Sequence, residues 1–298
     1  MNKPKRLEIA NKVFPVIGFL AAVFGLVMVI FLIYNVVTTG FPRLNWQFLI
    51  SFPSRKPLEA GILSAWVGTI WIVVTTVMVA FPAGVSAAIY LEEYAKKNWM
   101  TELIEINIAN LSAVPAIIYG LLGLELFVRI LKLGNSVLAG GLTMGLLVLP
   151  TIIISSREAI RSIPSTIREA SYALGATKWQ TIRKQVIPAA MPGILTGAIL
   201  AISRAIGEAA PLIMIGALTY IAFLPEMPIK SDFPFISLKG LFDGFTNMPI
   251  QIFNWVTRPQ RGFSVNAAAA ITILLVIVFI INGIVALLRN RYEKKMRW

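Results

Sequence analysis

The sequence predicts an all-α integral membrane protein, with six membrane-spanning helices and a helical hairpin between the fourth and the fifth. Hydrophobic residues make up 57% of the 298 positions and charged residues only 14%, against about 25% charged residues in soluble domains. Apolar runs long enough to cross a bilayer, about 20 residues each, recur along the whole chain. The mean hydropathy of +0.77 agrees with this class. A chain of this length has no room for a large soluble domain as well.

The distribution of positive charge predicts which side of the membrane faces the cytoplasm. Most of the 27 lysine and arginine residues fall at the chain ends and in the loops on the same side. Positive charge is enriched in cytoplasmic loops, so both termini are expected in the cytoplasm. The same distribution accounts for the net charge of +13 without nucleic-acid binding. The lack of Cys and His removes disulfides, thiol chemistry and His-based metal sites.

The first span is predicted from Val13 to Val37, after a basic cytoplasmic tail of residues 1–12. A secretory signal peptide has an apolar core of about 7 to 15 residues and a small-residue cleavage site. This apolar run is far longer, and no such site ends it. We therefore expect a retained helix that anchors the chain.

The next three spans are predicted from Gly61 to Leu91, Ile108 to Leu131 and Ser136 to Ile154. The second span exceeds the bilayer thickness, which predicts tilt or protrusion. Prolines within the spans leave two interpretations open. They are ordinary membrane-helix composition, with neighbouring helices satisfying the freed carbonyls, or they mark hinges of helices that rearrange. These residues are Pro82, Pro115, Pro150, Pro192 and Pro211.

Three charged pairs have the four-residue spacing that brings side chains together on a helix. Two lie just beyond the second span, where the spacing predicts a solvated helical surface, and the third lies near the outer end of the third span, where it favours an interfacial pair. The pairs are Glu92 with Lys96, Glu93 with Lys97, and Glu125 with Arg129.

A basic insert, residues 155–190, predicts two short cytoplasmic helices joined at Gly175. Thr166 to Glu169 matches a capping box that would begin the first helix, and Gly175 can adopt the left-handed conformation that ends it. Thr177 to Gln180 matches a second capping box, for a helix expected to stop before Pro188. From these residues alone, an interfacial amphipathic hairpin and a docking surface are equally supported. Close approach of a partner is favoured by the small side chains of Ala170, Ser171 and Ala173.

The fifth span is predicted from Met191 to Phe223 and contains Arg204 and Glu208, whose spacing would place them on one helix face. A central arginine is unfavourable by about 2.5 to 3.5 kcal/mol on insertion scales, and it usually faces the bundle interior or an aqueous path. Two roles remain open. One is an internal ion pair that orients helices; in the other, Arg204 attracts an oxyanion while Glu208 positions the guanidinium and limits how tightly the anion is held.

The outer segment from Leu224 to Val265 is the longest loop and is rich in Phe and Pro. It is expected to lie partly at the membrane surface. The sixth span is predicted from Asn266 to Leu288, and residues 289–298 form a basic cytoplasmic tail.

Three stretches of the chain resemble membrane subunits of bacterial ABC importers. The pattern Glu169-Ala170-Ser171-x-x-x-Gly175, followed by Ile187-Pro188, is similar to the EAA motif of that family, with Ser171 where a second alanine is usual. Val114 to Leu121 and Pro192 to Leu212 are similar to stretches of phosphate importer subunits of the PstA type. The last stretch is the more substrate-specific signal, because importers of many solutes share the EAA loop.

This resemblance implies a six-span permease of the type I ABC importer architecture, with residues 155–190 carrying a coupling helix for a separate ATPase. It implies that Arg204 and Glu208 contribute to a phosphate pathway. The implied partners are a homologous second permease subunit, two ATPase subunits that bind ATP and Mg²⁺, and an external phosphate-binding protein, for which the outer loop could supply part of a docking surface. The residues implied in ATPase coupling are Glu169, Ala170, Ser171, Gly175, Ala176 and Thr177.

The chain itself is expected to be neither an enzyme nor an ATP-binding protein, because it has no Gly-x-x-x-x-Gly-Lys-Ser/Thr motif. Three other functions stay open. They are an importer subunit for another oxyanion or solute, an ion-coupled secondary transporter with its site at Arg204 and Glu208, and a scaffold without transport. No obvious inverted repeat supports the secondary transporter.

Overall fold

The computed structural model of the chain describes residues 3–227 and 237–295, and over these residues the fold is helical, with a single isolated β-bridge between Ser136 and Gly244. Five helical stretches are long and apolar enough to cross a membrane, and one bent pair of helices makes a sixth span if it counts as one. The predicted all-α fold is therefore confirmed, and the six predicted spans are matched if the bent pair crosses the membrane as one span. The five stretches are Asn11–Arg43, Leu63–Tyr94, Val137–Arg161, Lys178–Gly207 and Arg261–Lys294.

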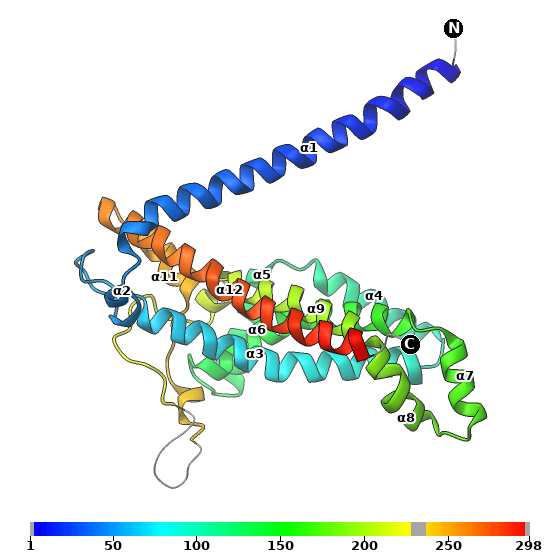
Figure 1. Ribbon diagram of the computed structural model, residues 1–298. Helices are drawn as coiled ribbons and strands as arrows, with labels where there is room; N and C mark the ends of the chain where they lie inside the picture. Colours follow the sequence, from blue (N-terminus) through cyan, green and yellow to red (C-terminus); the bar gives the residue numbers. More distant parts are fainter. Residues whose placement is uncertain (1–2, 228–236, 296–298) are drawn as a thin grey trace.

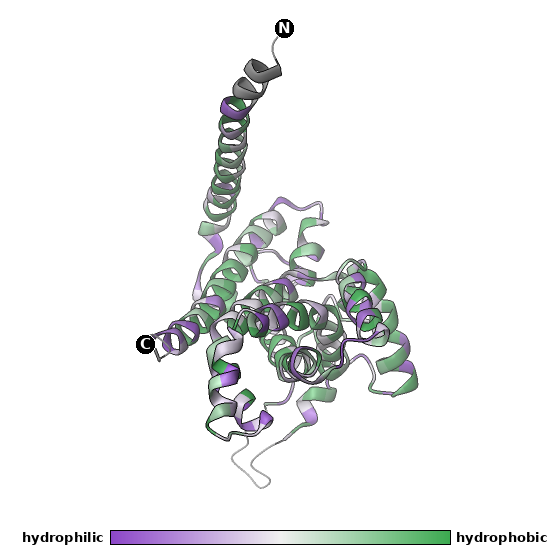
Figure 2. Cartoon of the chain, turned by 90° about the vertical axis from the view of Figure 1, so that its right-hand side faces the viewer, coloured by the Kyte–Doolittle hydropathy of each residue, from purple (hydrophilic) through white to green (hydrophobic). Residues whose placement is uncertain are grey.

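The first helix, α1 (Lys3–Gly40), diverges from the rest of the molecule (Figure 1). The apolar part of this helix that could span a membrane is not buried within the molecule, and its surface is almost wholly apolar (Figure 2). The helix meets the bundle near its C-terminal end, where a side chain at Gly40 would lie 2.5 Å from the backbone nitrogen of Ala269. That residue belongs to α12 (Arg261–Lys295), the sixth span. Both helices are longer than predicted, because each continues into its basic tail.

The centre of the molecule is a bundle of α3 (Leu63–Ile89), α6 (Val137–Arg161) and α9 (Ile187–Gly207), with α12 against α9. Small residues allow these helices to approach closely. A side chain at Gly141 would clash with Thr75, and one at Gly197 would clash with Ser155. The apolar core between them includes Ile72, Met144, Leu147, Ala201 and Ala205. At its inner end α3 continues as a wider π-helical turn, η2 (Tyr90–Tyr94).

The third span is broken, so the prediction of one helix from Ile108 to Leu131 is wrong. The helix α4 (Trp99–Ser112) and the helix α5 (Ala116–Gly123), which continues as the π-helix η3 (Leu124–Ile130), meet at 105°. The cause is Pro115, which has no N–H to donate to the carbonyl of Leu111 and whose ring would clash with that carbonyl in a continuous helix. The Leu111 carbonyl instead accepts from the Val114 backbone N–H at 3.2 Å and from the Tyr119 hydroxyl at 2.7 Å.

The fifth span begins earlier and ends earlier than the predicted Met191 to Phe223. The helix starts as α8 (Lys178–Thr181), continues through the π-helix η4 (Ile182–Val186) into α9, and ends at Gly207. Pro188 was expected to stop a helix, but it occupies the first turn of α9, directly after the wide turn η4. There its missing N–H is tolerated.

The end of the bundle opposite η2 is closed by short helices: η1 (Phe41–Arg43), α2 (Trp46–Ile50), η5 (Lys239–Phe242) and α11 (Met248–Val256). The rings of Phe48, Trp255 and Phe263 pack together there. Of the predicted outer loop, residues 228–236, which include Lys230 and Asp232, lie outside the described residues. The described part is anchored by α11, whose Met248, Ile250 and Trp255 are buried.

Candidate coupling loop and substrate pathway

The predicted hairpin is present as α7 (Ser165–Ala173) and α8, at the end of the bundle opposite α2 and α11 (Figure 1). The first predicted capping box is wrong. The helix α7 begins at Ser165, directly after Pro164, and Pro164 makes no side-chain cap. Proline is favoured at a helix start, and its position places Thr166 within the first turn rather than before it.

The turn between the two helices has the predicted left-handed conformation at Gly175. Gly175 has φ +79, and the bonds from Gly175 N to Tyr172 O (2.9 Å) and from Ala176 N to Ser171 O (3.2 Å) form a Schellman motif. The second capping box is confirmed: the Thr177 hydroxyl accepts from Gln180 N, and the Gln180 side chain accepts from Thr177 N at 2.8 Å.

The hairpin presents a mixed small, apolar and basic surface. Ser171 and Thr181 share a hydroxyl–hydroxyl bond of 2.9 Å that ties α7 to α8. Leu174, at the turn between the two helices, is 89% exposed. An open groove of about 540 Å³ beside it is lined by Ile167, Ala170, Ser171, Leu174, Gly175, Ala176, Gln180, Lys184 and Gln185. All predicted coupling residues except Glu169 and Thr177 thus line one groove, and these two lie exposed on the same hairpin.

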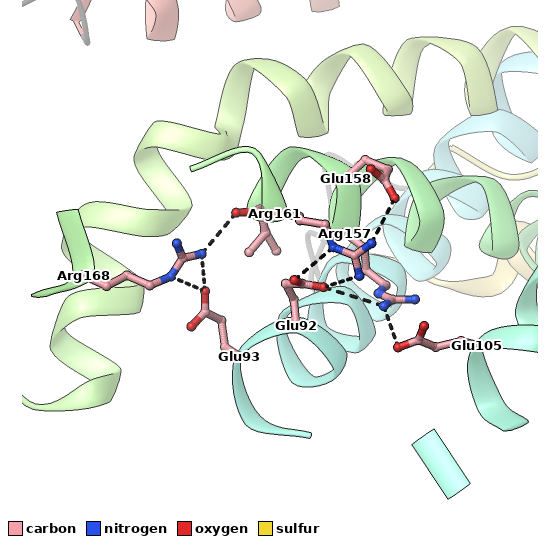
Figure 3. Close-up of polar contacts among 8 residues, drawn as sticks. Glu92, Glu93, Glu105, Arg157, Glu158, Arg161 and Arg168 are labelled. Carbon is pink, nitrogen blue, oxygen red and sulfur yellow. Dashed lines mark hydrogen bonds and ion pairs between the residues drawn. The ribbon is translucent and has the colours of Figure 1, made fainter. Parts of the chain in front are cut away.

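An ion-pair network joins the base of the hairpin to the inner ends of α3, α4 and α6 (Figure 3). Arg161 binds Glu92 through two bonds of 3.1 and 3.2 Å, and Arg157 contacts Glu105 at 2.6 Å and Glu92 at 3.6 Å. We call this set the inner network. Its members are Glu92, Glu93, Glu105, Arg157, Glu158, Arg161 and Arg168.

The prediction that Glu92 and Glu93 form a solvated surface with Lys96 and Lys97 is wrong, because both glutamates belong to the inner network. The side chain of Glu93 is only 7% exposed, and Arg168 binds it at 2.7 Å. Among the described residues, no ion pair joins either glutamate to either lysine. The reason is η2, which ends at Tyr94 and returns the chain toward α4 before the two lysines.

The prediction that Arg204 and Glu208 share one helix face is wrong. The helix α9 ends at Gly207, and Glu208 is extended, with φ −94 and ψ 126. In a continuous helix, Pro211 would clash with the carbonyl of Gly207, so the helix breaks and resumes as α10 (Ala210–Met214). Among the described residues, no hydrogen bond or ion pair joins Arg204 to Glu208.

Arg204 lies instead where the two broken spans meet. The next residue, Ala205, belongs to the same buried cluster as Tyr119 of α5 and Leu212 of α10. A side chain on Gly120 would lie 2.7 Å from the Cα of Pro211, so α5 and α10 are in close contact. Arg204 is half-buried in the last turn of α9, where the helix dipole favours a cation. Sequence reasoning missed that the segment after the break in the fifth span packs against Tyr119 and Gly120, although both lie in the stretch Val114 to Leu121 that carries part of the resemblance.

The Glu125–Arg129 pair is present at 2.9 Å, with both side chains more than half exposed. It lies on η3, and its position at the membrane interface stays a prediction.

Comparisons with known proteins place the chain in a family. Residues 80–297 match the family model described as "Binding-protein-dependent transport system inner membrane component". The chain is 31% identical to the probable ABC transporter permease protein YqgI of Bacillus subtilis, over 94% of each chain. It is 32% identical to the phosphate transport system permease protein PstA of Mycobacterium leprae, over 91% of this chain and 86% of the relative.

Solved structures share the fold. A chain of the MetNI methionine ABC transporter, in inward-facing conformations, has a TM-score of 0.58 at 17% identity, covering 78% of this chain and 95% of that one. A chain of a bacterial ABC transporter involved in the import of the acidic polysaccharide alginate has a TM-score of 0.61 at 11% identity, covering 99% and 100%. The architecture is that of an ABC importer permease. The chain belongs to the family of binding-protein-dependent transport system inner membrane components.

Proposed function

We propose that this chain is a membrane subunit of an ATP-driven importer and forms part of the pathway for inorganic phosphate. The observation that carries this proposal is Arg204, a half-buried cation in the last turn of α9, next to the buried cluster in which the two broken spans meet. Curated PstA relatives, named as phosphate transport permeases, are similar over most of the chain. A guanidinium is suited to a phosphate oxyanion because it offers several N–H donors in a plane.

Arg204 has no ion-pair partner among the described residues, so an entering anion would compete with no bound carboxylate. Glu208 follows the break and is half-buried. In the proposed pathway it repels the anion as α9 and α10 rearrange, and so promotes release. This role replaces the expected one, in which Glu208 held the guanidinium.

The energy comes from partners. In the proposed assembly, two ATPase subunits bind ATP and Mg²⁺, and one of them contacts the groove beside Leu174 and the exposed Glu169. A homologous permease subunit supplies the other half of the pathway, and an external binding protein delivers phosphate. The chain is thus a transport subunit and not itself an enzyme.

Both termini lie on the cytoplasmic side in this proposal. The N-terminal end of α1 and the C-terminal end of α12 extend toward the end of the molecule that carries α7 and α8 (Figure 1). The basic residues at both ends agree with that side.

The test is phosphate uptake into vesicles that contain the complex purified through a tag on this chain. We expect uptake to need ATP and phosphate-loaded binding protein. Arg204→Gln should abolish uptake while the ATPase subunits still co-purify, because the guanidinium lies remote from the hairpin. Glu169→Lys should instead reduce ATPase co-purification. Uptake at the wild-type rate in Arg204→Gln would contradict the pathway role.

The same vesicles separate the alternatives. Stimulation of ATP hydrolysis by sulfate or molybdate rather than phosphate would indicate an importer for another oxyanion. Uptake driven by a proton or sodium gradient without ATP would indicate a secondary transporter and overturn the proposal.

A further inference from the structure

The coupling hairpin is held to the inner end of the second span by two adjacent contacts. On α7, Arg168 binds Glu93 of η2 at 2.7 and 3.0 Å. On α8, the ammonium of Lys178 lies 4.8 Å from the ring centre of Tyr94, also in η2, which is a cation–π distance. Both helices of the hairpin are therefore attached to the same short turn, although about 75 residues of sequence separate the partners in the first contact.

Arg168 connects three elements through one guanidinium. Besides Glu93, it donates to the carbonyl oxygens of Ile163 (2.7 Å) and Ile160 (3.1 Å), at the C-terminal end of α6. The Arg168 side chain is 19% exposed and that of Glu93 is 7% exposed. A charge pair so little exposed to water is weakly screened, and separating its members would leave a buried charge without a partner. The planar guanidinium also fixes their relative orientation.

A buried apolar cluster lies at the same inner end and joins the same helices. It contains Ala88 of α3, Ile160 of α6, and Val186 and Ile194 of η4 and α9. From there α3 and α6 pack on each other along their length, down to the core that includes Tyr119 and Ala205. Packed helices therefore connect η2 and the end of α6 to the surroundings of Arg204.

We propose that Glu93 and Arg168 are positioning residues of a rigid link that carries movement of the coupling hairpin to the inner ends of α3 and α6. The proposal rests on the proposed function, in which the ATPase subunits move the hairpin. By the covalent chain alone, α7 is joined to α6 through Ser162 to Pro164 and to α8 through the turn at Gly175. The link adds a direct connection to the second span, which is remote from the hairpin in sequence.

The first experiment measures how strongly phosphate-loaded binding protein stimulates ATP hydrolysis by the purified complex. Glu93→Gln removes the charge but keeps an acceptor, and Arg168→Lys keeps the charge but cannot reach all three acceptors. We expect the ATPase subunits to co-purify with both variants, while the stimulation ratio falls about fivefold or more, the lower end of typical coupling between sites. The double variant should lose little more than the stronger single variant, because both act on one contact. Glu125→Gln, in the exposed outer pair, is the matched control and should retain the full ratio.

The second experiment distinguishes a link from mere stabilisation. The chain has no cysteine, so spin labels can be placed at chosen exposed positions without background. Labels at Thr166→Cys and Lys96→Cys report the distance between α7 and the end of the second span, and Thr166→Cys with Asn290→Cys reports movement relative to α12. In the wild-type background we expect ATP to change the second distance and not the first. With Glu93→Gln, ATP should change both.

The outcomes separate the two proposals. A wild-type complex that neither retains ATPase subunits nor responds to phosphate-loaded binding protein would refute the proposed function. A wild-type complex that does both, with variants that keep its stimulation ratio, would overturn only the link. An ATP-dependent change of the distance between positions 166 and 96 in the wild-type background would overturn it too, and this measurement decides the question if Glu93→Gln fails to assemble.

Discussion

Thr177 fixes the start of α8 and, with Gly175, the angle between the two helices of the hairpin. Thr177→Val should lower the local free energy of unfolding by about 1 kcal/mol, because the side-chain acceptor for Gln180 N is lost. Hydrogen exchange at residues 178–181 should then accelerate by about fivefold. Thr177→Ser keeps the hydroxyl and should exchange as the wild type does. Equal exchange in Thr177→Val and the wild type would contradict the capping role.

The correct predictions for the hairpin concern residues that are neighbours in sequence. The left-handed Gly175 and the capping box at Thr177 depend on contacts within a few residues. The box at Thr166 matched the same pattern, but α7 begins at Ser165, two residues earlier than a cap at Thr166 would allow. Glu93 was assigned to Lys97 by spacing, whereas its partner Arg168 is 75 residues away and is brought there by packing of α6 against α3.

At the scale of elements, the close contact of α5 with α10 shapes the surroundings of Arg204. Gly120→Ala would place a methyl group 2.7 Å from the Cα of Pro211, a backbone atom that no side-chain rotation can move away. We expect a destabilisation of about 1 to 3 kcal/mol from this overpacking, seen as a lower thermal unfolding temperature, and phosphate uptake reduced about tenfold or more.

The matched control is Gly145→Ala in α6, where the nearest atom, the Ala80 Cβ, would be at an ordinary 3.8 Å. This variant should unfold and transport as the wild type does. If Gly120→Ala unfolded and transported as Gly145→Ala does, α5 and α10 would have to separate freely. The proposed geometry at Arg204 would then be wrong.

Hydropathy predicted that six spans exist but not which of them are broken. Pro82 and Pro150 lie within intact helices, whereas Pro115 and Pro211 follow breaks, and composition does not distinguish the two cases. What differs is the neighbourhood. Tyr119 satisfies the carbonyl freed at the first break, and Gly120 allows α10 to pack there. The predicted Arg204–Glu208 pair failed for the same reason, since it assumed an unbroken helix.

At the scale of the whole molecule, the bent pair α4–α5 decides the topology. If the pair crosses the membrane, the chain has six spans, both termini lie on the same side, and the hairpin α7–α8 lies with them. If the pair enters and leaves on one side, five spans remain, and everything after α5 is inverted. The one-sided positive charge favours six. The inner network agrees, because it binds α7 to the end of α3 and so places both on one side.

Single cysteines in this cysteine-free chain test that topology directly. Asn11, Lys56, Ser165 and Arg291 are exposed. They lie in the N-terminal part of α1, in the loop between α2 and α3, at the start of α7 and near the end of α12. A membrane-impermeant maleimide added to intact cells should label Lys56→Cys alone, and permeabilised cells should label all four. Labelling of Ser165→Cys and Arg291→Cys from outside would mean five crossings, with the hairpin out of reach of any cytoplasmic ATPase. Because that result would leave Asn11→Cys protected, the experiment separates an inverted second half from general leakage of the reagent.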